Sequence, residues 1–229
     1  MRRKILVVAG SILVVLAVGL LLITQRDHGK NERVTAVSGD PATCPDPLVL
    51  TMPVEEKLVT SMLWPGQERG GDFKAHGGFR FDGSQADDIT VRAPLDARLT
   101  DASRYLEGGD EQYLLFFETD CGVSFRFDHL FNFSPKLAAA LKDLPPAKPN
   151  DSRTTRITEL VTFAAGEELA HSVGSPSRSN IFVDFGLYET RPDGADGLCF
   201  FDYLPADLAT RLKNLPTGNE GKHSTFCSD

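Results

Sequence analysis

Residues 5–24 form an uncharged run of Leu, Val and Ile that only small residues interrupt, and such a run has few possible structures. About 20 apolar residues are what an α-helix needs to cross a bilayer whose hydrocarbon core is about 30 Å thick. Residues 1–4 before the run are basic, and positive flanks stay on the cytoplasmic side. We therefore predict a cytoplasmic segment over residues 1–4, a transmembrane helix over residues 5–24 and an extracytoplasmic location for the remainder.

The end of the apolar run lacks a small-residue cleavage signature, because residues 20–23 continue its apolar character, and no cysteine is present for lipidation. An uncleaved signal anchor is therefore favoured over a removed signal peptide, which predicts a single-pass protein of the cell membrane. Residues 25–45 are polar and turn-rich and form an expected extracytoplasmic tether. Residues 46–229 remain, and this length suits one globular domain.

The formal net charge of −8 argues against nucleic acid and anionic lipid surfaces as partners of the main domain. Either surface would repel the chain unless a local basic patch compensated. Beyond the N-terminal cluster, Lys and Arg residues are dispersed singly along the sequence. No nucleic-acid partner is expected, and contact with the membrane is expected only through residues 5–24.

The four cysteines all lie outside the predicted anchor, and none belongs to a C-x-x-C pair. Two disulfides in an oxidising compartment are therefore the first interpretation, and zinc-ribbon spacing is absent. Four cysteines allow three connectivities, among which sequence does not choose rigorously. We favour Cys199 with Cys227, which would join the polar C-terminal tail to the domain, and Cys44 with Cys121, which would join the tether to a strand end.

The pattern of the domain is mostly β. Short runs with strand character, bounded by Gly, Pro and Asp, recur at 48–52, 58–64, 75–82, 89–94, 95–99, 112–117, 123–130, 157–163, 168–173 and 180–188. The run 112–117 is apolar on both faces, which is typical of a central strand. Two helices are predicted, one after the Ser134-Pro135 cap and one over residues 205–215, each with Leu at helical spacing and a Pro at its end. These patterns predict an antiparallel β-sheet or sandwich with two short packing helices.

The stretch 75–82, A-H-G-G-F-R-F-D, supplies the first candidate site residues. Alternation places Phe79 and Phe81 on one face and His76, Arg80 and Asp82 on the other. Such a polar trio lines a ligand site in some strands, but more often it is only the solvated side of a half-buried strand. The segment alone favours the second interpretation.

Two further strands carry polar residues in alternation. In 123–130, the face shared by Val123, Phe125 and Phe127 is also predicted to include His129. In 180–188, one face carries Asn180, Phe182, Asp184 and Gly186, opposite Ile181, Val183, Phe185 and Leu187. His171 is interpreted as an exposed strand residue, while His28 and His223 lie in the polar tether and tail.

Taken in order, these pieces resemble the lysostaphin and LytM type of zinc metallopeptidases, which cut peptide cross-bridges of bacterial cell walls. That family carries H-x-G-x-D, a following strand and turn, Y-x-H-L, a hairpin, and finally H-x-H. The matching pieces here are His76-Gly77-Gly78-Phe79-Arg80, residues 91–99, Phe127-Asp128-His129-Leu130, residues 163–170 and residues 180–184. The resemblance implies a β domain of the duplicated-hybrid-motif type.

The departures from this pattern concern the metal. In the family, the first histidine, the aspartate of H-x-G-x-D and the second histidine of H-x-H hold zinc. Here Arg80 replaces the aspartate, and H-x-H has become Asn180-Ile181-Phe182 or Phe182-Val183-Asp184. A guanidinium at a ligand position opposes a dication. The resemblance therefore implies a degenerate member with no cofactor, in which Arg80 takes the place of the ion and pairs with Asp82 or Asp184.

Three functional hypotheses follow. The favoured one is a membrane-anchored, extracytoplasmic, non-catalytic pseudopeptidase that binds a cell-envelope peptide or glycopeptide, or regulates a partner wall hydrolase. Its groove would carry His76, Arg80, Asp82, His129, Asn180 and Asp184. The second is a zinc-dependent hydrolase with altered ligands, in which His76, Asp82 and Asp184 would hold the metal and His129 would be catalytic. The third is an unrelated secreted β domain of unknown binding function.

Overall fold

The computed structural model describes residues 43–191, 194–219 and 221–228. The predicted transmembrane helix and nearly all of the predicted tether lie outside these residues. No helix in the described ranges is long and apolar enough to cross a membrane.

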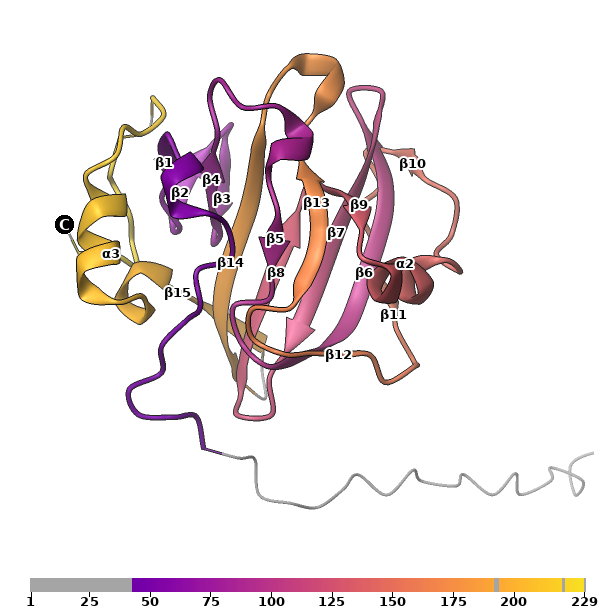
Figure 1. Cartoon of the computed structure of the whole chain (residues 1–229), viewed down its shortest axis with the longest axis horizontal. Coiled ribbons are helices and arrows are strands. Elements are labelled where there is room, and N and C mark those ends of the chain that lie inside the picture. Colours follow the sequence, from indigo (N-terminus) through magenta and orange to yellow (C-terminus); the bar gives the residue numbers. More distant parts are fainter. Residues whose placement is uncertain (1–42, 192–193, 220, 229) are drawn as a thin grey trace, which may run out of the picture. The chain divides into compact units, whose positions relative to one another are not determined.

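Among the described residues, ten strands form the larger sheet (Figure 1). Along its main path the order is β1 (Ser61–Leu63), β4 (Gly77–Arg80), β14 (Phe182–Arg191), β8 (Val123–Asp128), β7 (Asp110–Glu118), β6 (Ala97–Glu107) and β10 (Lys148–Pro149). β11 (Thr155–Arg156) and β12 (Thr162–Phe163) pair with β6, and β15 (Gly194–Leu198) pairs with β14. The expectation of a purely antiparallel sheet is corrected in one place, because β10 runs parallel to β6.

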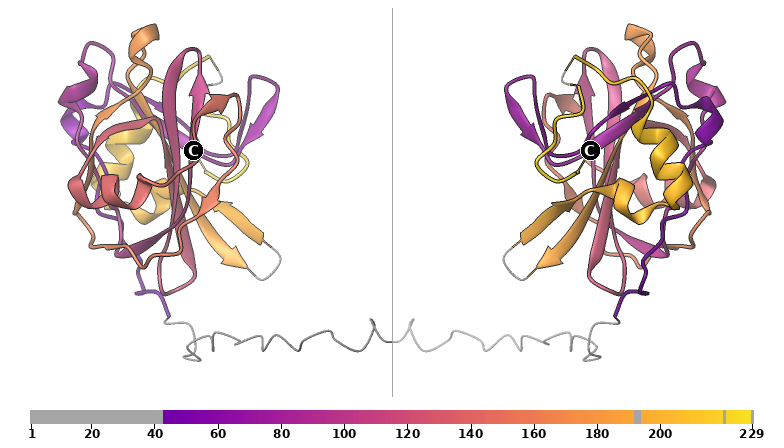
Figure 2. Two further views of the ribbon diagram at one scale, coloured as in Figure 1. Left: turned by 90° about the vertical axis from the view of Figure 1, so that its right-hand side faces the viewer. Right: turned by 90° about the vertical axis from the view of Figure 1, so that its left-hand side faces the viewer.

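A three-stranded sheet of β5 (Val91–Arg92), β13 (Glu168–Val173) and β9 (Leu130–Phe133) lies over one face of the larger sheet (Figure 1). The hairpin of β2 (Gln67–Arg69) and β3 (Asp72–Lys74) forms a third, separate sheet. Helix α2 (Pro135–Leu141) contacts β9, and α3 (Ala206–Lys213) lies beside β1 (Figure 1). The arms of β14 and β15 extend beyond the rest of the larger sheet (Figure 2). The part of the chain that the structure describes also contains four 3-10 helices, η1 (Glu56–Leu58), η2 (Ala86–Asp88), η3 (Pro176–Arg178) and η4 (Phe200–Tyr203).

Phenylalanines on one face of the larger sheet form the centre of the core. Phe125 stacks on Phe117 with ring centroids 4.9 Å apart, and Phe185 lies 5.1 Å from Phe127. Phe79 continues the cluster 6.0 Å from Phe185. Because side chains alternate along a strand, the residues between these rings face the other side of the sheet, and that side carries the polar residues described below.

Both predicted helices are present and act as packing elements. The Ser134 hydroxyl accepts a hydrogen bond from the Leu137 amide, which caps α2, and Pro135 occupies the first turn. The buried leucines of α2 are Leu137 and Leu141, and those of α3 are Leu208 and Leu212. Helical spacing of Leu therefore correctly predicted which side of each helix is buried.

Several strand predictions are wrong in extent. The run 48–52 is not a strand, because its backbone makes single hydrogen bonds to Tyr203 and Pro94 instead of a ladder. The strand predicted over 95–99 continues as β6 to Glu107, and a bulge between Leu99 and Asp101 shifts its alternation and hides the pattern. Only residues 61–63 of 58–64 and 162–163 of 157–163 are strands. The β7 strand is central, as predicted.

The two favoured disulfides are confirmed. Cys44 is joined to Cys121, and Cys199 is joined to Cys227. The second bond holds the C-terminal tail to the domain, where the Ser224 hydroxyl also donates to the Pro65 carbonyl at 2.6 Å. No cysteine in the described ranges is free.

Candidate functional site

Asp184 lies where three strands of the larger sheet run side by side. It is opposite Gly78 on β4 and opposite Asp128 on β8. A Cβ at residue 78 would lie 2.8 Å from the Val183 carbonyl oxygen and 3.1 Å from Asp184 Oδ1. The second glycine of the H-G-G motif therefore leaves the space in which the Asp184 carboxylate sits.

Two histidines face this carboxylate from opposite sides. His76 Nε2 lies 3.0 Å from Asp184 Oδ2, and His129 Nε2 lies 3.8 Å from the same oxygen. His129 Nδ1 is 3.0 Å from Gln112 Oε1, and the Gln112 amide donates in turn to the Gly174 carbonyl at 3.3 Å. Since the Gln112 oxygen is an acceptor, Nδ1 carries a proton and Nε2 is the nitrogen presented to Asp184.

The electrostatic state of Asp184 follows from these neighbours. Burial is the largest single influence and by itself raises the pKa of the carboxyl. The hydrogen bond with His76, together with the electrostatic influence of His76, His129 and Arg126, outweighs burial and holds the pKa of Asp184 well below its ordinary value. Asp184 is therefore an anion whose charge is matched within the site.

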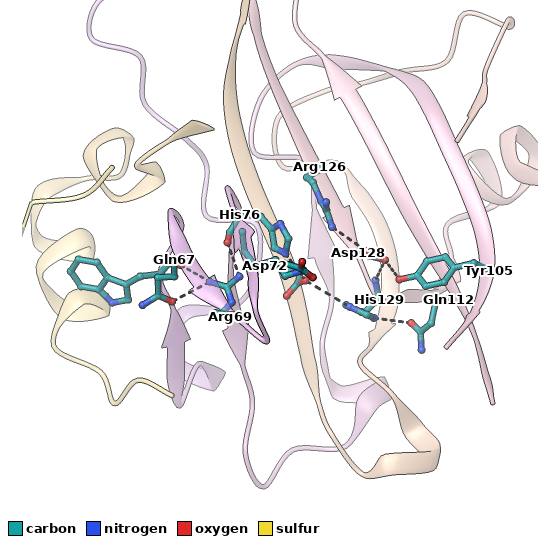
Figure 3. A network of polar contacts seen from close by, with 12 residues as sticks. Gln67, Arg69, Asp72, His76, Tyr105, Gln112, Arg126, Asp128 and His129 are labelled. Atoms are coloured by element: carbon teal, nitrogen blue, oxygen red, sulfur yellow. Dashed lines mark hydrogen bonds and ion pairs between the residues drawn. The ribbon is translucent and has the colours of Figure 1, made fainter. Parts of the chain in front are cut away.

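Asp128 is the centre of a second, connected set of contacts, shown in Figure 3. Its carboxylate accepts hydrogen bonds from the Tyr105 hydroxyl at 2.9 Å and the His129 amide at 3.0 Å, and Arg126 Nη2 lies 3.0 Å away. Burial raises the pKa of Asp128, while His129 and Arg126 oppose the rise. Like charges on directly opposed strand residues repel each other. The hydrogen-bond donors around Asp128 offset the repulsion between its carboxylate and that of Asp184.

These residues line a cavity of about 440 Å³. Its wall includes the β2–β3 hairpin, where Arg69 donates to the carbonyl oxygens of Trp64 and His76 at 2.7 and 2.8 Å. The lining combines cations, carboxylates and imidazoles, and includes Arg69, Lys74, His76, Glu107, Arg126, Asp128, His129 and Asp184. Such a lining suits a polar ligand that carries both charges, for example a peptide with its carboxylate.

His129 does not lie where simple alternation predicts. It was expected on the face of Phe125 and Phe127, but its φ of 69° breaks the strand between β8 and β9. This turn directs the ring to the opposite face, where it contacts Asp184 and packs at a tilt against Phe182 with centroids 4.4 Å apart. Left-handed backbone at a non-glycine residue is uncommon and is not visible in a period-two pattern.

The six residues predicted to share one groove divide into two groups. His76, His129 and Asp184 lie together in the cavity described above. Arg80 and Asp82 line a neighbouring cavity of about 540 Å³, bordered by residues 216–219 near the C-terminal tail. Arg80 donates to Asn180 Oδ1 at 3.3 Å and lies 3.8 Å from Asp82 Oδ1. The predicted partnership of Arg80 is thus with Asp82, and Asn180 joins the Arg80 group.

The donor set does not fit the zinc site that the resemblance implies. The described residues include no group of three His, Cys, Asp or Glu side chains that could hold a metal ion. His76 and Asp184, two of the three ligands in the altered-ligand hypothesis, lie within hydrogen-bonding distance of each other. Asp82, the remaining candidate ligand, instead accepts hydrogen bonds from Thr60 and Ser61 and pairs with Arg80.

Sequence reasoning did not predict the contributions of Gln112, Tyr105, Arg126 and Arg69. Alternation in 123–128 does place Arg126 and Asp128 opposite the phenylalanines, which was an available signal. Gln112 and Tyr105 reach the site from β7 and β6, and no local pattern shows that β7 pairs with β8 and that β6 lies one strand further along the sheet.

No protein-family model matches the chain, and no curated protein matches its sequence. Similar solved structures include Csd3 of Helicobacter pylori, with a TM-score of 0.39 and 11% identity over 72% of this chain. A putative glycyl-glycine endopeptidase lytM from Ruminococcus gnavus has a TM-score of 0.30 and 12% sequence identity over 72% of this chain. Lysostaphin has a TM-score of 0.34 and 12% sequence identity over 73% of this chain. The alignments cover 40%, 64% and 55% of those three chains. This chain therefore spans less than two thirds of the length of each of these proteins.

The depressed pKa of Asp184 predicts an acid-sensitive contribution to stability. A carboxyl whose pKa is lower in the folded chain stabilises the fold above its unfolded pKa of about 3.9, and this contribution is lost as pH falls below that value. The difference in unfolding free energy between the unmodified chain and Asp184→Asn should therefore shrink between about pH 5 and pH 3. Urea unfolding across this range measures it.

Asp128→Asn is the matched control, because the pKa of Asp128 is shifted in the opposite direction. A raised pKa stabilises the fold below the unfolded pKa, and this contribution is lost as pH rises through the folded pKa. The difference between the unmodified chain and Asp128→Asn should therefore grow as pH falls. If the stability difference from the unmodified chain changed in the same direction with pH for both variants, the assignment of opposite pKa shifts would be contradicted.

Proposed function

We propose that this chain is a pseudopeptidase of the cell envelope, which binds a peptide or glycopeptide in the cavity around Asp184 without hydrolysing it. The observation that carries the proposal is the 3.0 Å contact between His76 and Asp184. In the family that the sequence resembles, the residues at these two positions both face the metal. Here they contact each other, and Arg80, which the resemblance aligns with the third ligand, donates instead to Asn180 and lines the neighbouring cavity.

The same proposal includes the location of the domain. Residues 5–24 serve as a membrane anchor, and residues 46–229 lie outside the cytoplasm. The two disulfides support this location, because structural disulfides persist in oxidising compartments. A bound envelope peptide would then lie within reach of the tethered domain, and a wall hydrolase acting on that peptide is the corresponding protein partner.

Metal analysis of the purified full chain tests the non-catalytic assignment. We expect well under one zinc per chain by mass spectrometry and a melting temperature that chelator does not change, because removal of a bound metal would destabilise the native state. Glycine-containing and wall-derived peptides should bind in calorimetry but remain intact. His76→Ala should weaken this binding, since it removes one wall of the cavity and leaves Asp184 without its nearest partner.

His171→Ala is the matched control, because His171 is an exposed strand residue that pairs with Glu168 away from the cavity. Binding should be unchanged in this variant. Stoichiometric zinc, together with peptide cleavage that His76→Ala abolishes and His171→Ala preserves, would contradict the proposal. Such a result would support the zinc-dependent hydrolase with altered ligands.

A further inference from the structure

A third cavity lies at the outer edge of β6, and it shares no lining residue with the cavity around Asp184. Along this edge, β6 pairs with β10 at residues 105–106 and with β11 at residues 101–102. The residues between these two pairings, Ser103 and Arg104, meet no partner strand on that side within the described ranges. A cavity of about 340 Å³ opens there, and its lining also includes Lys148, Asp151, Arg153 and Thr155.

Ser103 gives this cavity an unsatisfied hydrogen-bonding group. The residue is 2% exposed, and its hydroxyl oxygen has no hydrogen-bond partner in the described part of the chain. A buried hydroxyl without a partner is destabilising, so most such groups in native proteins are paired. A ligand oxygen in the cavity would provide the missing partner.

The charged groups around Ser103 are mainly cationic. Arg104 is held in place by hydrogen bonds to the carbonyl oxygens of Leu144 and Pro145 at 2.9 and 3.1 Å. Lys148 is exposed and forms no close ion pair among the described residues, but its charge helps to lower the pKa of the nearby Asp151. Arg153 is matched by Asp151 in a two-pronged contact at 2.7 and 2.6 Å. Three cations and one carboxylate therefore line a cavity on a chain whose net charge is −8.

We propose that this cavity is a binding site for an oxyanion, a phosphate or carboxylate group, held by Lys148 and Arg104 and by a hydrogen bond from Ser103. The cations and the hydroxyl are all donors, and oxyanions accept several such bonds at once. The site is separate from the proposed peptide cavity, and it does not depend on whether that cavity binds or hydrolyses a peptide.

Calorimetric titration of the full chain with inorganic phosphate tests the site, with sodium chloride at matched ionic strength as the baseline. We expect saturable binding that Lys148→Gln weakens about threefold to tenfold, because it removes one charge-assisted contact at a partly exposed position. Ser103→Ala should weaken binding similarly without lowering the melting temperature, because it removes a buried group that lacks a partner. Titration with acetate distinguishes a carboxylate ligand from one specific for phosphate.

Lys57→Gln is the matched control, because Lys57 is an exposed lysine paired with Glu55 and does not line the cavity. It should leave phosphate binding unchanged. A phosphate effect no larger than that of chloride would overturn the proposal. So would equal affinities for the Lys148 and Lys57 variants, or a loss of binding in His76→Ala alone, which would place the anion in the other cavity.

Discussion

Asp128→Ala is expected to lower the free energy of unfolding by about 3 to 5 kcal/mol, because removing one partner of a buried ion pair leaves the other charge uncompensated. The Asp128 and Arg126 side chains are only 9% and 15% exposed, so solvent screens their contact little. Arg126 Nε already has no hydrogen-bond partner within the described residues, which adds to the penalty once the carboxylate is gone. Urea unfolding at neutral pH measures the loss.

Two further variants separate the parts of this effect. Asp101→Ala removes the same side chain from a pair with Arg156, whose side chain is 64% exposed, and should lower stability by at most about 1 kcal/mol. Tyr105→Phe removes only the hydroxyl that donates to Asp128, and should lower stability by about 1 kcal/mol. An Asp128→Ala loss no greater than that of Asp101→Ala would show that Asp128 is not the centre of a buried network.

Removal of the Cys44–Cys121 disulfide is expected to destabilise the fold by about 4.5 kcal/mol, and removal of Cys199–Cys227 by about 3.5 kcal/mol. The estimates follow from the loss of chain entropy in the unfolded state, which grows with the loop that each bond closes. The sequence separations are 77 and 28 residues. Double Cys→Ala variants of each pair, unfolded in urea, measure both values.

The informative outcome is which of the two disulfide variants loses more unfolding free energy. A larger loss for the Cys199–Cys227 pair would contradict the loop-entropy explanation and would indicate that packing of the C-terminal tail dominates. Limited proteolysis is the accompanying measurement. The Cys199–Cys227 variant alone should expose the tail to cleavage near Lys222, because that disulfide and the Ser224 contact with Pro65 hold the tail to the domain.

The fold was predictable where local patterns carry the information. The Ser134-Pro135 cap predicted α2, because capping and proline preferences act within one helical turn. The alternation in 180–188 predicted the buried face of Val183 and Phe185 opposite Asp184. The course of β6 was not predictable, because its bulge shifts the period on which such predictions rest.

The sequence by itself determined the chemical groups available to the candidate site, including His76, His129, Asp184 and the arginine at position 80. Only the tertiary structure decided which of them meet. The positive φ of His129 turns its ring toward Asp184, and the glycine at position 78 lets that carboxylate approach His76, while Arg80 pairs elsewhere. The physical reason is that strand pairing joins residues about 50 to 100 positions apart, and the resulting distances depend on backbone geometry that no local period encodes.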